Sequence, residues 1–170
     1  RNVQIVDYPS AADLLSGKYT DVRKPQTAEK KRIIWAPHFT IFSGGPITQS
    51  NFLWMAELML DLAKHYSQKL QFAFKPHPVL KFKLLNLWGE KKTEEYYNRW
   101  ANLSNAQIEQ GDYIDLFKTS DAMIHDCGSF TVEYLYTKKP VLFQIRDEKV
   151  KDEFNTFGQA CFAQHYHAYS

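Results

Sequence analysis

The sequence predicts an α/β fold, a Rossmann-like parallel sheet with helices on both faces. Short apolar runs alternate with longer amphipathic stretches from residue 32 to residue 143, and this alternation is typical of βαβ units. Polar clusters follow three of the apolar runs, at His38, at His77 and from His125 to Ser129. Because the carboxyl ends of parallel strands lie at one edge of a sheet, we expect these clusters to meet in one crevice.

Length and composition indicate a single globular domain. The chain has 170 residues, of which 44% are hydrophobic and 15% aromatic, enough for a packed core and unlike a disordered segment. A net charge of +2 is too small to indicate nucleic-acid binding. No apolar run approaches the roughly 20 residues of a membrane span. Cys127 and Cys161 form neither a disulfide framework nor a zinc motif, so we expect no resident metal.

The elements of the first half follow from apolar runs and their breakers. Val3–Val6 is strand-like, Ala11–Leu15 favours a helical turn, and the polar, lysine-rich residues 16–31 are typical of a linker. Arg32–Ala36 predicts a buried strand, because a proline stops this apolar run. Leu70–Phe74 predicts the next strand for the same reason. Apolar side chains at helical spacing predict helices over residues 51–66, 79–87 and 91–103.

The second half repeats the pattern with shorter elements. Tyr113, Leu116 and Phe117 lie on one side of a short predicted helix over residues 112–118. A polar turn leads into a further helix that begins near Ser129. From Lys151 the aromatic tail is predicted to be helical. Strands are predicted at Ala106–Ile108, Ala122–Ile124 and Val141–Phe143.

The turn before Ser129 has the composition of a phosphate site. Small hydroxylated residues and a glycine stand where a helix begins, and the free N–H groups and positive end of a helix suit an anion. Glu133 comes one helical turn later, where a carboxylate can meet ribose hydroxyls. The alternatives are an ordinary helix cap at Ser129 and an exposed helix face at Glu133. The predicted nucleotide set in this segment is His125, Asp126, Gly128, Ser129, Thr131 and Glu133.

Two further strand exits carry candidate catalytic and phosphate-binding residues. Lys75 and His77 stand beside two prolines, which stiffen the backbone there. Phosphate contact, or acid–base work by His77, is one interpretation; a rigid turn with a solvated imidazole is the other. His38 poses the same choice. No Gly-x-Ser-x-Gly elbow, GxGxxG or Walker loop is present, which disfavours hydrolase, dinucleotide or ATP sites of those types.

Several short motifs occur in a particular order along nearly the whole chain. They are Tyr8-Pro9 with Asp13, Trp35-Ala-Pro37, Phe74-Lys75-Pro-His77-Pro78, Asp112–Leu116, Ile124–Ser129, Glu133 and Lys139-Pro140-Val141-Leu142. This order resembles the C-terminal half of CDP-glycerol glycerophosphotransferases, the teichoic-acid polymerase family. The resemblance implies the C-terminal half of a GT-B fold, in which this domain binds the CDP portion of the donor. It assigns the family's Pro-His-Pro histidine to His77, its phosphate turn to Asp126–Ser129 and its ribose carboxylate to Glu133.

The chain departs from the family pattern at two places. The family often has Thr, an aromatic residue and Arg after Ala-Pro, where this chain has His38-Phe39-Thr40-Ile41. Cys127-Gly128 replaces the Tyr-Ser of the phosphate turn. These departures bear on the identity of the donor more than on the fold.

The resemblance also implies a domain organisation and partners. Residues 1–31 would be an interdomain crossover and linker, and residues 32–170 the nucleotide-binding domain of a larger bacterial enzyme. The expected donor is CDP-glycerol or a similar nucleotide, with no cofactor and no nucleic acid. A lipid-linked glycan acceptor would bind the full-length enzyme, at the cytoplasmic face of the cell membrane. Membrane association would come only through parts outside this chain.

The predicted activity is transfer of glycerol phosphate, or a related polyol phosphate, from a CDP-linked donor to a cell-surface polymer. His38 or His77 would act as base or stabilise phosphate charge. A nucleotide-sugar glycosyltransferase or UDP-sugar 2-epimerase relative remains an alternative, because one fold supports several chemistries. That alternative would take uridine rather than cytidine. A non-catalytic α/β module is a third possibility, and it would bind no nucleotide.

Overall fold

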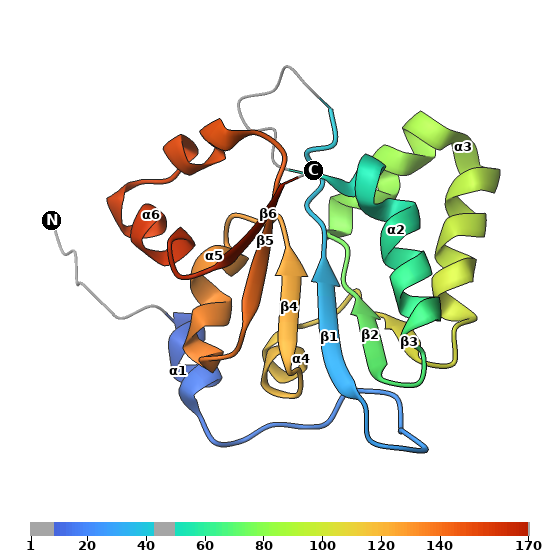
Figure 1. The fold of residues 1–170 in the computed structure, drawn as a ribbon, viewed down its shortest axis with the longest axis horizontal. Coiled ribbons are helices and arrows are strands. Elements are labelled where there is room, and N and C mark those ends of the chain that lie inside the picture. The colour runs from blue at the N-terminus through green and yellow to red at the C-terminus, as the bar shows by residue number, and fades with distance from the viewer. Residues whose placement is uncertain (1–8, 43–49, 170) are drawn as a thin grey trace, which may run out of the picture.

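A computed structural model describes residues 9–42 and 50–169. Six strands, all parallel, form one sheet in the order β3-β2-β1-β4-β5-β6, and their arrows point the same way in Figure 1. The strand order reverses between β1 and β4, where doubly wound sheets bind ligands. The Rossmann-like prediction is confirmed. The strands are β1 Lys31–Ala36, β2 Leu70–Phe74, β3 Ala106–Ile108, β4 Ala122–His125, β5 Val141–Ile145 and β6 Tyr166–Tyr169.

Helices cover both faces of the sheet, as predicted. One face packs against α2 and α3, and the other against α1, α4 and α5. Six α-helices and two 3₁₀ segments are present in the described residues. They are α1 Pro9–Leu15, α2 Phe52–His65, α3 Pro78–Ala101, α4 Ile114–Lys118, α5 Phe130–Glu133, η1 Tyr134–Thr137, η2 Glu148–Glu153 and α6 Thr156–Phe162.

The strand sequences explain why both faces are covered. Trp35 of β1 lies in the cluster under α2 and α3, whereas its neighbours Ile34 and Ala36 lie in the cluster under α1 and α4. All three side chains are buried. Alternate residues of a strand point to opposite faces, so a strand buried on both sides needs a continuous apolar run. This requirement accounts for the short apolar runs of the sequence.

The segment before β1 packs against the domain. Leu14 of α1 is buried in the core beside α4. Farther along, the Lys24 N–H donates to Gln107 Oε1 at 2.7 Å, and Gln71 Nε2 donates to Lys24 O at 2.7 Å. Residues between α1 and β1 are therefore bonded to β2 and β3, although they form no helix or strand. The strand-like run Val3–Val6 lies outside the described residues.

Two element predictions differ from the structure. The helical stretches 79–87 and 91–103 form α3, interrupted at Gly89, whose φ of 78° is a conformation that glycine adopts readily. The tail is not wholly helical, because Tyr166–Tyr169 adds β6 to the edge of the sheet beside β5. A strand of 4 residues depends on its neighbour for hydrogen bonds, so local pattern alone did not predict it.

Candidate functional site

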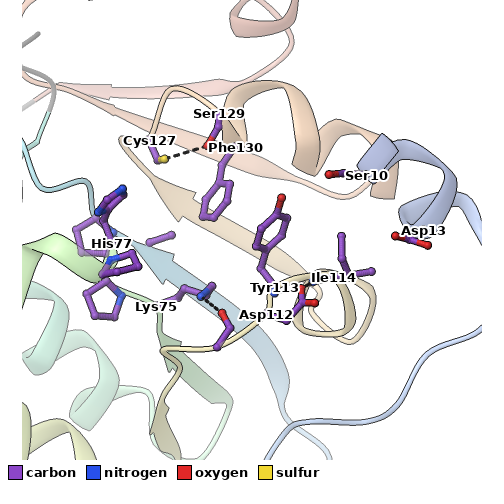
Figure 2. A pocket seen from close by; sticks show the side chains of 15 residues that line it. Ser10, Asp13, Lys75, His77, Asp112, Tyr113, Ile114, Cys127, Ser129 and Phe130 are labelled. Atoms are coloured by element: carbon purple, nitrogen blue, oxygen red, sulfur yellow. Dashed lines mark hydrogen bonds between the residues drawn. The ribbon is translucent and has the colours of Figure 1, made fainter. Parts of the chain in front are cut away.

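A pocket of about 620 Å³ opens at the carboxyl ends of the central strands (Figure 2). Its lining includes Pro37 after β1, Lys75 and His77 after β2, and Ser129 after β4. A second pocket, of about 400 Å³, shares His77 and Ser129 with the first and adds His38 and Gly128 to the lining. The strand exits thus lie at one edge of the sheet and border two pockets that share lining residues. That they form one ligand crevice stays a prediction.

Strand register and backbone hydrogen bonds bring the exits together. Trp35 lies opposite Phe74 in β2, and Ala36 lies opposite His125 in β4, so the three strands end at nearly one level. Beyond the strands, the His77 N–H donates to Pro37 O at 3.1 Å. Each side chain at this edge is therefore placed by the sheet rather than by a free loop.

His38 and His77 form a small aromatic group with Phe39. The two imidazole centroids lie 5.2 Å apart, and the Phe39 ring lies 4.4 Å from the first and 4.3 Å from the second. Burial and the neighbouring His77 lower the pKa of His38 to about 4. Burial, then the Lys75 ammonium, lowers the pKa of His77. Both imidazoles are therefore neutral at pH 7.

Hydrogen bonds orient the two imidazoles differently. His77 caps α3, because its Nδ1 accepts from the Val79 N–H at 3.2 Å. The proton of the neutral ring then lies on Nε2, which makes that nitrogen a donor. His38 Nδ1 lies 2.9 Å from Thr40 Oγ1, a hydroxyl oxygen that can accept a hydrogen bond from a ring N–H at this position. In that tautomer His38 Nε2 keeps a lone pair.

Lys75 provides a cation at the inner wall of the pocket. Its side chain is buried, and Nζ donates to Gly111 O at 2.7 Å (Figure 2). Burial lowers the pKa of this amine, whereas the carboxylates of Glu109 and Asp112 act in the opposite direction. The hydrogen bond also fixes the loop before α4, so Lys75 joins two walls of the pocket.

The helix that follows the turn after β4 is short. The helix begins where predicted, but α5 has only 4 residues before it passes into η1. Ser129 is exposed and makes no side-chain cap hydrogen bond; its Oγ lies 3.5 Å from Cys127 Sγ. Ser129 therefore stands at the N-cap position, as the alternative expects, but its side chain does not cap the helix. Because α5 is so short, the helix dipole adds little. The Ser129 and Phe130 N–H groups are directed at the Cys127 sulfur, so the exposed Ser129 hydroxyl is the group that this turn offers to an anion.

Three members of the predicted phosphate set support the turn from behind. Asp126 is fully buried; its carboxylate accepts from the His38 N–H at 2.5 Å and the Asn51 N–H at 2.6 Å. Burial raises its pKa to about 6. Thr131 Oγ1 donates to Cys127 O at 3.2 Å, and the His125 ring is fully buried. All three side chains are buried and line neither pocket, so the structure places them behind the turn, and a phosphate contact by any of them stays a prediction.

Glu133 is buried rather than lying on an exposed helix face, so that alternative is wrong. It lines neither pocket. Burial raises the pKa of Tyr113, and a hydrogen bond with Glu133 raises it further. A ribose contact by Glu133 stays a prediction.

Sequence reasoning missed an aromatic wall. Tyr113 and Phe130 pack with ring centroids 5.2 Å apart and line the side of the pocket away from His77 (Figure 2). Ile114 adjoins them, and Ser10 and Asp13 of α1 extend the same side. The helical pattern of residues 112–118 placed Tyr113 on an apolar side but gave no sign that this side borders a pocket.

A metal-binding cluster and a membrane-spanning helix are both absent from the described part of the chain. No group of three or more His, Cys, Asp or Glu residues there is arranged to hold a metal ion. Among the helices of residues 9–42 and 50–169, none has the length and hydropathy that crossing a membrane requires.

Solved structures resemble this chain at low sequence identity. UDP-GlcNAc 2-epimerase from Methanocaldococcus jannaschii matches with a TM-score of 0.55 and 13% identity, over 85% of this chain and 36% of that one. S. aureus MnaA, solved with UDP, matches with a TM-score of 0.45 and 19% identity, over 79% of this chain and 35% of that one. A putative UDP-N-acetylglucosamine 2-epimerase from Listeria monocytogenes matches with a TM-score of 0.45 and 16% identity, over 89% of this chain and 34% of that one. The chain thus spans about a third of the length of each of these structures, and the likeness to the M. jannaschii structure shows the fold alone.

A search of curated proteins gave no significant match. The sequence model of CDP-glycerol:poly(glycerophosphate) glycerophosphotransferases, in contrast, matches residues 18–154. This range contains β1 to β5 and the strand exits that build the pocket. The chain therefore belongs to the CDP-glycerol:poly(glycerophosphate) glycerophosphotransferase family.

Proposed function

We propose that this chain is the donor-binding domain of a transferase that moves glycerol phosphate, or a related polyol phosphate, from a CDP-linked donor. The acceptor is a hydroxyl of a lipid-linked glycan, held by the full-length enzyme at the cytoplasmic face of the cell membrane. The observation that carries the proposal is the meeting of Lys75, His77 and Ser129 in one pocket, in a chain of this family. The donor supplies its own leaving group, so the proposed reaction uses no cofactor.

The pocket suits a nucleoside diphosphate in size and polarity. Its volume of about 620 Å³ lies within the usual range for small-molecule sites. Lys75 and the Ser129 hydroxyl offer a charge and a donor to the phosphates. Tyr113 and Phe130 offer an apolar wall to a flat base. A ligand with a ring at one end and anionic oxygens at the other satisfies both parts.

His77 fits the role of a hydrogen-bond donor to the phosphate better than that of a base. Its Nδ1 already accepts the Val79 N–H, so Nε2–H faces outward as a donor in the neutral ring. Taking up a second proton would break the cap of α3. We assign His77 to stabilising the negative charge that develops on the transferred phosphate.

His38 fits the role of base. The acceptor oxygen attacks the β-phosphorus and forms the new P–O bond, while the bond from that phosphorus to the bridging oxygen breaks and CMP leaves. The proton of the acceptor hydroxyl passes to His38 Nε2. The pKa of about 4 in the free protein is low for this task, but donor phosphates beside the ring raise it by favouring the imidazolium.

A nucleotide panel tests the proposal. Thermal unfolding of the chain is measured with CMP, CDP, UMP, UDP and CDP-glycerol, followed by calorimetry on the best ligand. We expect the cytidine compounds to raise Tm, because a ligand that binds only the folded state stabilises it. Stabilisation by uridine compounds alone would favour the nucleotide-sugar alternative. No stabilisation by any of the five would favour a non-catalytic module.

A further inference from the structure

Two buried imidazoles lie behind the turn that carries Ser129. His125 ends β4 and is fully buried, and His165, just before β6, is 7% exposed. Their ring centroids are 5.3 Å apart. Neither ring lines the donor pocket. The pair therefore connects the C-terminal segment to the back of the turn rather than to the ligand.

The Nδ1 atoms define the proton positions. His165 Nδ1 lies 3.0 Å from Cys161 O, and a carbonyl only accepts, so this nitrogen carries the proton and Nε2 keeps a lone pair. His125 Nδ1 lies 3.1 Å from both N and O of Cys127. Cys127 O already accepts from Thr131 Oγ1. If His125 Nδ1 accepts from the Cys127 N–H, both backbone groups of Cys127 have a partner and the His125 proton lies on Nε2.

The two Nε2 atoms are then complementary. Both are buried, and neither has a hydrogen-bond partner within the described residues. One is a donor and the other a lone pair, in adjacent rings. Burying an unpaired polar atom is costly, and rotation of the two rings into an N–H···N hydrogen bond would satisfy both atoms at once.

We propose that His125 and His165 are a positioning pair for the donor-phosphate turn. His165 holds the His125 proton on Nε2, and His125 Nδ1 then holds the Cys127 N–H, which sets the path of the backbone into Gly128 and Ser129. Neither imidazole touches the donor. The expected effect of the pair on donor affinity rests on the proposed function. Its effect on the backbone of the turn does not require a bound ligand.

Four substitutions separate hydrogen bonding from ring packing. His125→Phe and His165→Phe keep a ring against Phe143 and Phe162 but remove the nitrogens. His125→Asn restores an acceptor at the Nδ1 position, and His165→Gln restores one at the Nε2 position. The exposed His65→Phe is the matched control. Urea unfolding first verifies that each variant folds.

The readouts are amide hydrogen exchange at Cys127, CDP-glycerol affinity by calorimetry, and imidazole nitrogen NMR of the unsubstituted chain. We expect both Phe variants to exchange the Cys127 amide at least about tenfold faster and to bind CDP-glycerol about tenfold more weakly. The Asn and Gln variants should recover most of this loss. NMR should show His125 protonated on Nε2 and His165 on Nδ1.

Two results would overturn the pair: folded Phe variants with unchanged exchange, or a His125 ring protonated on Nδ1. The NMR result decides even if a Phe variant does not fold. Failure of the unsubstituted chain to bind CDP-glycerol would instead count against the proposed function. In that case exchange and NMR still decide whether the pair positions the turn.

Discussion

Ser129 gives the most direct test of the donor site at the scale of single residues. Its hydroxyl is exposed at the pocket, where it can donate to a phosphate. Losing one hydrogen bond to a charged group costs about 1.5–3 kcal/mol, so Ser129→Ala should weaken CDP-glycerol binding by tenfold or more in calorimetry. Ser104→Ala, an exposed serine outside the pocket, is the control. Unchanged affinity in Ser129→Ala would remove this residue from the site.

The division of labour between the two pocket histidines predicts a pH profile. In the full-length enzyme, His38→Ala should reduce the rate about 100-fold or more if His38 is the base. Burial holds the pKa of His38 at about 4 in the free protein, so kcat/KM should fall only as the pH approaches 4. An acid limb near pH 6.5 would show instead that the base is a group with an ordinary imidazole pKa.

The buried His125 predicts a pH-dependent stability. Burial, then the neighbouring His165, lowers its pKa to about 3, below the value of about 6.5 in the unfolded chain. The unfolded state therefore binds more protons, and the contribution is full above pH 6.5 and lost as the pH falls. Between pH 7 and pH 5, urea unfolding should show the stability of the unsubstituted chain drop by about 2 kcal/mol more than that of His125→Phe.

The comparison with His125→Phe isolates this single imidazole. The pKa of Asp126 is raised to about 6 by burial, so its stabilising contribution is lost as the pH rises, opposite to that of His125. Asp126 is present in both proteins, and its effect cancels. Parallel pH curves for the two proteins would mean that His125 is not held neutral.

At the scale of elements, β1 depends on one aromatic side chain. Trp35 is fully buried and stacks on Phe52 and Phe74, with ring centroids 5.7 and 5.0 Å away. Trp35→Ala should reduce the free energy of unfolding by about 3–5 kcal/mol, because it removes a large ring and leaves a cavity. Trp54→Ala, 56% exposed on α2, should cost less than about 1 kcal/mol. Equal losses in the two variants would contradict the observed core.

The same scale separates what local pattern predicts from what it does not. The strands β1, β2 and β3 and helix α2 were predicted within a residue or two, because apolar periodicity and proline breakers are local signals. The length of α5 was not, since the chain passes into 3₁₀ geometry and then reaches Lys138 at a φ of 57°. β6 was missed because its hydrogen bonds come from β5 across a long intervening segment.

At the scale of the whole molecule, we expect this chain to bind the nucleotide donor but not to catalyse transfer. The chain spans only 36% of the length of the M. jannaschii structure that shares its fold, and we propose that a second domain holds the acceptor. Catalysis requires donor and acceptor to be aligned, and this alignment can lower the activation barrier by several kcal/mol. CDP-glycerol should therefore raise the Tm of this chain, with no CMP release above background when a lipid-linked acceptor is added.

The full-length protein is the positive control for that experiment and should release CMP under the same conditions. The His77→Ala variant of the full-length protein should release CMP about 100-fold more slowly if the imidazole acts on the transferred phosphate. Efficient turnover by the present chain alone would show that the catalytic unit is complete within it.

By itself the sequence determined the fold class and the edge of the sheet where the candidate site lies. Strand–helix alternation predicts parallel strands, and parallel strands necessarily end at one edge, so His38, His77 and Ser129 were expected to meet. Only the tertiary structure decided which neighbours of these residues face the pocket. His125 shares the strand face of Met123 and is covered by the C-terminal segment, while Ser129, four residues later, is exposed. The direction of a side chain depends on strand alternation and on packing partners distant in sequence, and neither His165 nor the aromatic wall has a local signal.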